Sequence, residues 1–332
     1  MRIIIFGKDG QLGKAFEALF DTAAPRLPKS IIIQYIGRAQ YDLSDQEKLA
    51  DVLKQFAPHL IINASAYTAV DKAETEIDLA YAVNALAPEI MAQYAAQNSA
   101  TLLHYSTDYV FDGEKYGFYL EDDMRNPLGI YGKSKAAGEE AIIKAFSAGT
   151  SGQYAIFRTS WVYGVGGNFI RTILRLAKER DELKVIHDQH GVPTSAAWLA
   201  GVSLDLVLNQ DGELKTFPSG IYHAVPAGET TWYGLASFAV QVAAEVGATL
   251  KVTSIKPIPA TDYPLPAPRP KNSRMATDKL QAVLTHSKNY FSDISISYND
   301  LNGLSSFPHW EVMVQDYVKK LVLDASTQNQ SN

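Results

Sequence analysis

The chain has 332 residues, a formal net charge of −6 and no cysteine. The acidic balance, without any basic run, argues against nucleic-acid and anionic-membrane partners, and the lack of cysteine excludes disulfides and thiolate metal sites. Because the apolar runs are too short for a membrane span or a secretory signal, we expect a cytoplasmic protein with one large domain and a smaller lobe.

The first predicted element is a buried strand at residues 2–6, followed by a glycine-rich turn and a helix. The glycines have the spacing G-x-x-G-x-x-G. Gly7 permits a sharp turn, Gly10 lets the backbone approach a pyrophosphate, and Gly13 lets the helix pack closely on the strand. This context predicts a dinucleotide site; the alternative is a glycine turn without a ligand. The residues predicted to contact the cofactor in this turn are Gly7, Gly10, Gln11 and Leu12.

The second predicted strand, residues 31–36, ends next to Arg38. An arginine at this point suits the 2′-phosphate of NADP, whereas an acidic residue would hold the ribose of NAD. Arg38 therefore favours NADPH. Asp42, beside Leu43, leaves NADH open, and all three residues are predicted cofactor contacts.

Strands and helices alternate through the first half of the chain. The predicted strands are 31–36, 59–63, 100–105 and 153–158, and the predicted helices are 45–56, 75–98 and 131–147. This order predicts an α/β fold, a Rossmann-type doubly wound parallel sheet, with ligands bound at the carboxyl ends of its strands. Two loops should lie there. Ala64, Ser65 and Ala66 are small enough for a cofactor to lie against the backbone, and Thr107 and Asp108 follow the next strand; plain connecting loops are the alternative.

Tyr131 and Lys135 are four residues apart on the predicted helix 131–147 and therefore share one face. An ammonium about 4 Å from a phenol is expected to lower the phenol's pKa from about 10. A phenol that exchanges its proton near neutral pH is what a carbonyl reductase needs. Taken alone, the same pair is typical of a solvated helix face.

Beyond residue 160 the alternation becomes irregular. We predict a helix at 168–180, a strand at 183–187, a helix at 195–209 and a proline-rich irregular segment at 258–270. The expected division is a nucleotide-binding domain at 1–160 with return segments near 183–210, a smaller α/β substrate-binding lobe at 161–182 and 220–324, and a frayed tail at 325–332.

Seven segments carry a resemblance to a known family. They are residues 6–13 (FGKDGQLG), 66–74 (AYTAVDKAE), 104–113 (HYSTDYVFDG), 131–135 (YGKSK), 157–163 (FRTSWVY), 188–194 (DQHGVPT) and 269–274 (RPKNSR). In this order and spacing the chain, to about residue 285, resembles the dTDP-4-dehydrorhamnose reductases, a branch of the extended short-chain dehydrogenase/reductases. The resemblance implies reduction of the 4-keto group of dTDP-4-dehydro-6-deoxy-L-mannose by hydride from NADPH. It also implies a place at the end of dTDP-L-rhamnose synthesis for cell-surface polysaccharide.

The resemblance implies three catalytic residues. Thr107 and Tyr131 would polarise the 4-keto oxygen, with Tyr131 as general acid, and Lys135 would hold the nicotinamide ribose and lower the pKa of the tyrosine. Donors aimed at an oxygen that gains negative charge stabilise the transition state more than the ground state. Thr107 has an alternative role as the cap of the helix that follows it.

Further residues are implied at the substrate. Trp161 would pack against the deoxysugar or the nucleotide, and Asp108 lies beside the catalytic threonine. Arg269, Ser273 and Arg274 would lie near the nucleotide end, where the two arginines suit bidentate contacts to phosphate. The alternatives are core packing for the tryptophan and a solvated surface position for the arginines.

Two departures from the family matter. Members that bind Mg²⁺ between subunits carry a glutamate after the glycine loop and another after the Pro-Thr motif, but this chain has Ala15 and the pair Ala196-Ala197. We therefore expect no metal site, and a monomer or weak homodimer. The segment 285–307 is also longer than usual, so the end of the chain should differ from the family.

Two other functions stay open. One is a nucleotide-sugar epimerase or dehydratase of the same superfamily, although Tyr109 stands where a dehydratase's Thr-Asp-Glu signature has its glutamate. The other is a non-catalytic subunit resembling the regulatory subunit of methionine adenosyltransferase. The complete set of Thr107, Tyr131 and Lys135 disfavours a non-catalytic role.

Overall fold

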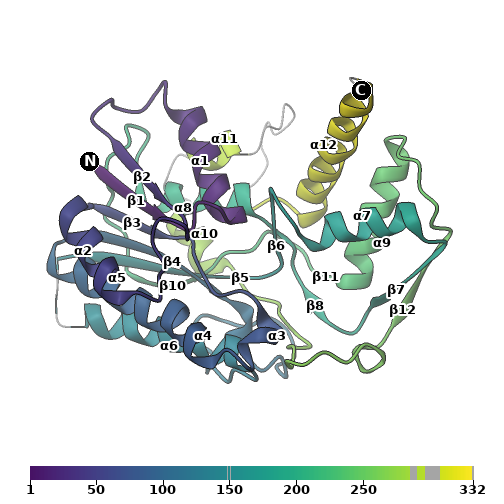
Figure 1. The fold of residues 1–332 in the computed structure, drawn as a ribbon, viewed down its shortest axis with the longest axis horizontal. Helices are drawn as coiled ribbons and strands as arrows, with labels where there is room; N and C mark the ends of the chain where they lie inside the picture. The colour runs from purple at the N-terminus through teal and green to yellow at the C-terminus, as the bar shows by residue number, and fades with distance from the viewer. Residues whose placement is uncertain (148, 150, 285–289, 296–306, 331–332) are drawn as a thin grey trace.

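The computed structural model describes residues 1–147, 149, 151–284, 290–295 and 307–330. Figure 1 shows two parts: a larger one built on a central sheet, and a smaller one formed mainly by α7, α9 and short strand pairs. The long helix α12 stands beside the smaller part.

The larger part is organised by a six-stranded sheet in the order β10-β5-β4-β3-β1-β2, with every neighbouring pair parallel. Its strands are β1 Arg2–Phe6, β2 Ile32–Ile36, β3 Leu60–Asn63, β4 Thr101–Thr107, β5 Gln153–Thr159 and β10 Gly220–His223. The strand order reverses between β1 and β3, and ligands bind at such a switch point. The predicted Rossmann-type α/β class is therefore confirmed.

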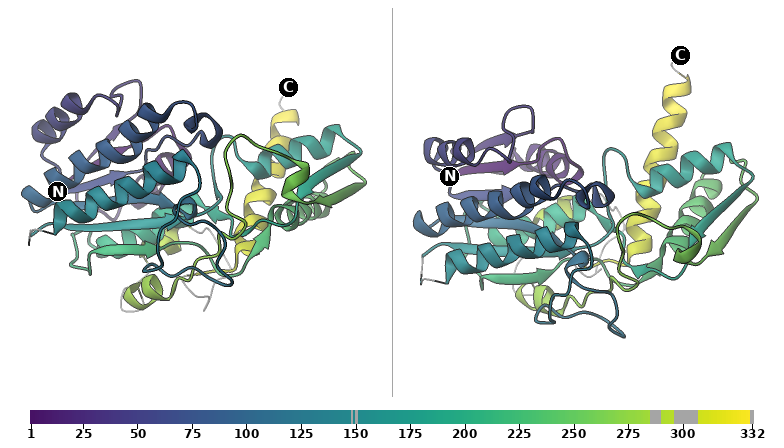
Figure 2. Two further views of the ribbon diagram at one scale, coloured as in Figure 1. Left: turned by 90° about the horizontal axis from the view of Figure 1, so that it is seen from below. Right: turned by 60° about the horizontal axis from the view of Figure 1, so that its bottom comes forward.

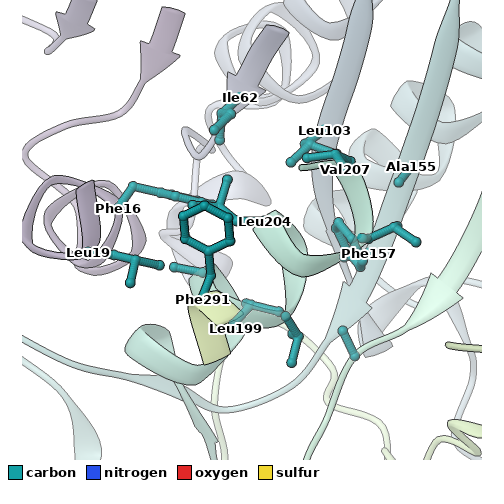
Figure 3. Close-up of a cluster of buried hydrophobic side chains, with 14 of the residues drawn as sticks. Phe16, Leu19, Ile62, Leu103, Ala155, Phe157, Leu199, Leu204, Val207 and Phe291 are labelled. Atoms are coloured by element: carbon teal, nitrogen blue, oxygen red, sulfur yellow. The ribbon is translucent and has the colours of Figure 1, made fainter. Parts of the chain in front are cut away.

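Helices cover both faces of this sheet (Figure 2). One face carries α1 Gln11–Ala23, α8 Ala196–Val207, α10 Asp278–Leu284 and α11 Tyr290–Ser295; the other carries α2 Gln46–Phe56, α5 Ala87–Gln97 and α6 Ile130–Phe146. Alternate strand residues point to opposite faces. Ile3 and Ile5 pack in the cluster on the α1 and α8 side, and Ile4 and Phe6 in the cluster on the α2 and α5 side. Figure 3 shows part of the first cluster, with Phe16 of α1 and Leu204 of α8 among its labelled side chains.

The predicted helix 75–98 is interrupted. It consists of α4 Ile77–Tyr81, a π-helical turn Ala82–Leu86 and α5, and a short helix, α3 Val70–Ala73, precedes it. The π-helical turn carries Asn84, whose amide donates to Ser134 Oγ of α6 at 3.0 Å and exchanges two hydrogen bonds with the backbone of Tyr67. A Cβ at Gly138 would lie 2.1 Å from the Asn84 carbonyl oxygen. This turn therefore ties the loop after β3 tightly to α6.

Among the described residues, the smaller part contains three short strand pairs and, with the adjoining α12, three helices. The pairs are β6 Val162–Tyr163 with β9 Thr194–Ser195, β7 Glu182–Ile186 with β12 Ser254–Ile258, and β8 His190–Gly191 with β11 Thr230–Thr231; the helices are α7 Phe169–Glu179, α9 Trp232–Glu245 and α12 Trp310–Gln330. Two 3₁₀ turns, Asp108–Val110 and Ala260–Asp262, follow β4 and β12 respectively. Within the described ranges, each helix is too short or too polar to cross a bilayer.

The predicted division of the chain differs from the structure at three places. β7 pairs in the smaller part, so only α8 of the segment 183–210 returns to the sheet. β10, α10 and α11 belong to the larger part, because β10 pairs with β5 and the two helices pack in its core. α12 continues to Gln330, through most of the predicted tail, because extending a formed helix costs less than starting one. Of the long segment 285–307, residues 285–289 and 296–306 lie outside the described ranges.

Candidate active site

A cavity of about 820 Å³ opens at the carboxyl ends of β1, β3 and β4. The predicted site residues that line it are Gly7, Gly10, Gln11, Leu12, Arg38, Asp42, Leu43, Ala64, Ser65, Ala66, Thr107, Asp108, Tyr131, Lys135 and Trp161. Arg269, Ser273 and Arg274 lie outside this lining. The structure therefore brings the predicted cofactor loop and the predicted catalytic residues to one cavity.

The glycine turn forms the cofactor end of the cavity with almost no side chains. Gly7 has φ +87°, and a Cβ on it would lie 2.7 Å from the Ala64 carbonyl oxygen. A Cβ on Gly13 would lie 2.1 Å from the Gly7 carbonyl oxygen. Gln11 donates from Nε2 to the Val162 carbonyl at 3.2 Å, and its buried Oε1 has no partner among the described residues. A turn of exposed backbone at the start of a helix suits the pyrophosphate of a dinucleotide, and the unpaired Gln11 Oε1 can accept a hydrogen bond from the same ligand.

Arg38 and Asp42 flank this cradle. The Arg38 side chain is 78% exposed, and its Nε lies 3.8 Å from Asp42 Oδ2. The Asp42 carboxylate accepts from the backbone N–H and hydroxyl of Ser44 at 3.0 and 2.8 Å, which lowers its pKa. The arginine is thus free to move toward a phosphate, whereas the carboxylate is already engaged.

Tyr131 lies at the start of α6, facing the end of β4. Burial raises the pKa of Tyr131 to about 12, against an opposing effect of the Thr107 hydroxyl. The four-residue spacing predicts a pKa below 10, and in this structure the pKa is raised instead. Loss of hydration disfavours the phenolate more strongly than the charge spacing alone suggests.

The Lys135 ammonium is fully buried and directed to β4. It donates to the Tyr105 carbonyl at 2.5 Å and lies 3.3 Å from His104 Nε2. Burial lowers the pKa of Lys135 to about 8, against an opposing effect of Glu139. Burial and the lysine charge also hold the pKa of His104 well below its usual range, so this imidazole is neutral.

A buried ion pair that sequence reasoning missed lies behind these groups. Arg158 on β5 donates to both carboxylate oxygens of Glu139 on α6, at 2.9 and 2.7 Å. Ser106 on β4 donates to the same carboxylate at 2.5 Å. The polar members of β4 and β5 lie within apolar runs that predict strands, and only their neighbours in space reveal the network.

Asp108 is buried next to the catalytic threonine. It accepts from Thr107 Oγ1 at 2.9 Å and from the hydroxyl of Ser273, and burial raises its pKa to about 6. Ser273 thus reaches the site through Asp108. Thr107 also accepts from the Tyr109 N–H at 3.2 Å, so it caps the 3₁₀ turn.

Two tryptophans form one wall of the cavity. The rings of Trp161 and Trp232 stack with centroids 3.8 Å apart and planes 18° from parallel. Trp161 has φ +48°, a strained value for a bulky residue, and a Cβ on Gly191 would lie 2.7 Å from its ring. Trp232 donates from Nε1 to Gln189 Oε1 at 3.2 Å. Sequence reasoning missed Trp232, since a tryptophan at a helix start has no recognisable motif.

Both predicted phosphate-binding arginines are paired with carboxylates. Arg269 donates from Nη1 and Nη2 to the two oxygens of Asp71, each at 2.8 Å. Arg274 donates to Glu229 at 3.1 Å and to Asn272 Oδ1 at 2.8 Å.

Comparison with known proteins decides the family. The profile of the RmlD substrate binding domain matches residues 1–302. A dTDP-4-dehydrorhamnose reductase of Escherichia coli K12 is 41% identical over 286 residues, which is 85% of this chain and 91% of that protein. The chain belongs to the dTDP-4-dehydrorhamnose reductase family.

Solved structures agree with this membership. A dTDP-4-dehydrorhamnose reductase from Bacillus anthracis, in complex with NADP, has a TM-score of 0.78 and 32% identity, covering 96% of this chain and 99% of that one. The corresponding protein from Clostridium acetobutylicum has a TM-score of 0.77 and 31% identity, covering 97% and 99%. A UDP-glucose 4-epimerase from Thermus thermophilus shares the fold alone, at 16% identity and a TM-score of 0.70.

That this chain lacks the family's Mg²⁺ site stays a prediction. Ala15 lies on α1, and Ala196-Ala197 opens α8. Among the described residues, no group of three or more His, Asp or Glu side chains is arranged to hold a metal ion.

Proposed function

We propose that this chain reduces the 4-keto group of dTDP-4-dehydro-6-deoxy-L-mannose with NADPH and releases dTDP-L-rhamnose. The observation that carries the proposal is the cluster of Thr107, Tyr131 and Lys135 on the wall of the cavity that the glycine turn opens. Membership of the reductase family and the NADP complex of the Bacillus anthracis relative support it.

The cofactor end would hold NADPH through shape and backbone. The turn at Gly7 and Gly10 would receive the pyrophosphate at the N-terminus of α1, and Ala64, Ser65 and Ala66 would lie along the dinucleotide. Arg38 would pair with the 2′-phosphate. Bound in this way, the cofactor supplies a hydride to the carbonyl carbon.

The catalytic end would supply the proton. A phenol whose pKa is about 12 is protonated at neutral pH, so Tyr131 is a proton donor in the direction of reduction. Its proton passes to the sugar oxygen as the C4–H bond forms. Thr107, whose single hydroxyl proton is donated to Asp108 in this structure, would turn it to the same oxygen. The Lys135 ammonium would stabilise the phenolate that remains.

Substrate contacts follow from the walls of the cavity. Trp161, backed by Trp232, would pack against the sugar or the base, and Asp108 would orient Thr107. Arg269 would face the nucleotide end with its pair to Asp71 kept, and Arg274 would meet the phosphates only if they displace Glu229. We also propose that the enzyme works in the cytoplasm as a monomer or weak homodimer that does not depend on Mg²⁺. Light scattering in EDTA and in excess Mg²⁺ should give one mass.

The direct test is NADPH consumption with the purified protein. The absorbance at 340 nm should fall when dTDP-4-dehydro-6-deoxy-L-mannose is added, with one NADPH used for each dTDP-L-rhamnose formed. UDP-glucose serves as the control and should leave the absorbance unchanged. A change of sugar without net NADPH loss would instead assign an epimerase, and no conversion would favour a non-catalytic role.

A further inference from the structure

The two acidic residues of the segment 66–74, Asp71 and Glu74, have no catalytic role in the chemistry described so far, yet both make specific contacts. Asp71 lies within the short helix α3, and Glu74 directly follows it. Asp71 contacts the segment 267–269, and Glu74 contacts the start of α6, the helix that carries Tyr131.

Glu74 caps α6 from outside the helix. The residue at the N-cap of α6 is Gly129, which has no side chain, and the first turn, Ile130–Lys133, contains no acidic residue. Glu74 Oε1 accepts the Ile130 N–H at 2.8 Å. A carboxylate at this place satisfies a free helix N–H and complements the positive end of the helix dipole. The cap therefore acts one residue before the proposed proton donor.

Asp71 fastens a second segment to α3. Its two oxygens accept from both terminal nitrogens of Arg269 at 2.8 Å, and Oδ1 also accepts the Ala267 N–H at 3.1 Å. The Arg269 contact is the main cause of the lowered pKa of Asp71. A bidentate charge-assisted pair of this kind fixes orientation as well as distance.

The two contacts converge on Tyr131. Gly129 lies between them, because a Cβ on it would be 2.6 Å from Glu74 Oε1 and 3.4 Å from Pro268 Cδ. The charge of Arg269 acts on the phenol of Tyr109, and the Tyr109 ring meets the Tyr131 ring edge-on with centroids 5.3 Å apart. Groups anchored on α3 thus hold the backbone just before the tyrosine and lie near the ring that packs against it.

We propose that Glu74 is a positioning residue for Tyr131, and that together with Asp71 it locks the segment 267–269 against the first turn of α6. Glu74 does not line the cavity, so it acts through Ile130. The kinetic consequence rests on the proposed function. Misplacing a catalytic group by about 1 Å costs on the order of 100-fold in rate, so loss of the cap should lower kcat by roughly 10- to 100-fold.

The test compares Glu74→Ala with Glu74→Gln. The alanine variant should lose kcat while KM for both the sugar and NADPH stays within about two-fold, since no binding group is removed. The glutamine variant keeps an acceptor oxygen of similar reach and should recover most of the rate.

The matched control is Asp45→Ala, which removes the side chain that accepts the Lys48 N–H at 3.2 Å at the start of α2. It should cost similar thermal stability and leave kcat unchanged. Equal kcat in Glu74→Ala and Asp45→Ala, or no recovery in Glu74→Gln, overturns the proposal.

Hydrogen exchange separates this proposal from the proposed function. In Glu74→Ala the amides of residues 130–133 should exchange about ten-fold faster, while those of α2 are unchanged; Asp45→Ala should do the reverse. If the wild-type protein did not reduce the sugar, the proposed function would fail, and the exchange rates would still decide whether Glu74 holds α6. Unchanged exchange at 130–133 contradicts the cap.

Discussion

The two ends of the cavity are built in different ways. The cofactor end consists of backbone, because Gly7 and Gly13 leave no room for a Cβ. The catalytic end consists of buried polar side chains, with Lys135 and Glu139 almost fully shielded from water. Cofactor binding should therefore depend on shape and on a few exposed charges, whereas catalysis should depend on ionisation states fixed by burial. Changes at one end should leave the other largely intact.

The largest expected effect is at the catalytic end. Tyr131→Phe keeps the ring against Tyr109 and removes only the proton donor, so kcat should fall by about 10²–10⁴-fold. Steady-state rates measure kcat for the catalytic end, and a fluorescence titration measures NADPH affinity for the cofactor end. The dissociation constant of NADPH should stay within about two-fold of the wild-type value. A large loss of cofactor affinity would mean that the two ends are not separate.

The second effect is on stability. Burial raises the pKa of Asp108 from 3.8, the ordinary value that applies to the unfolded chain, to about 6 in the folded protein. The proton on Asp108 therefore adds to the free energy of unfolding. This addition is complete below pH 3.8 and is lost as the pH rises through 6. The loss amounts to about 3 kcal/mol by proton linkage. Asp108→Asn cannot ionise and should remove this part of the pH dependence. Urea unfolding of both proteins at several pH values between 4 and 7 makes the comparison, and parallel curves would contradict it.

A smaller effect is expected in the pH profile. Lys135 loses its charge as the pH rises through about 8, so kcat/KM should fall about ten-fold per pH unit above that value. Tyr131 titrates far higher and cannot produce this limb. Initial rates in buffers from pH 6 to 10 test the assignment. A profile that stays flat to pH 10 would show that burial does not perturb the lysine in solution.

The smallest effect is at the cofactor end. Arg38→Ala should weaken NADPH by several-fold to about ten-fold and leave NADH nearly unchanged, because only NADPH carries a 2′-phosphate. The side chain is mostly exposed, so solvent screening limits the gain. Fluorescence titration with each cofactor measures the difference. Equal losses for the two cofactors would remove Arg38 from the phosphate site.

The same difference explains which parts of the site sequence reasoning could predict. The cofactor end depends on local order, a strand followed by glycines at fixed spacing and a helix, and this order is readable along the chain. Tyr131 and Lys135 were also accessible, because their spacing is local to one helix. The Glu139–Arg158 pair and the stacking of Trp232 on Trp161 join elements distant in sequence, so no local pattern reveals them.

The fold shows the same limit. The parallel strands β1 to β5 follow from apolar runs alternating with helices. β10 does not, because only its partner β5 makes the short segment Gly220–His223 a strand of the main sheet. The pKa of Tyr131 differs from the predicted one for a related reason, since its burial is set by the packing of α6 against β4 and not by the residue four positions away.

The most direct test of the central claim is isotope transfer. The wild-type protein is incubated with dTDP-4-dehydro-6-deoxy-L-mannose and NADPH carrying deuterium at both positions of nicotinamide C4, and the sugar product is examined by mass spectrometry and NMR. We expect dTDP-L-rhamnose with one deuterium on C4 of the sugar and one equivalent of oxidised cofactor. Product without deuterium at C4, or a cofactor that keeps both deuteriums after the sugar has changed, would contradict the assignment.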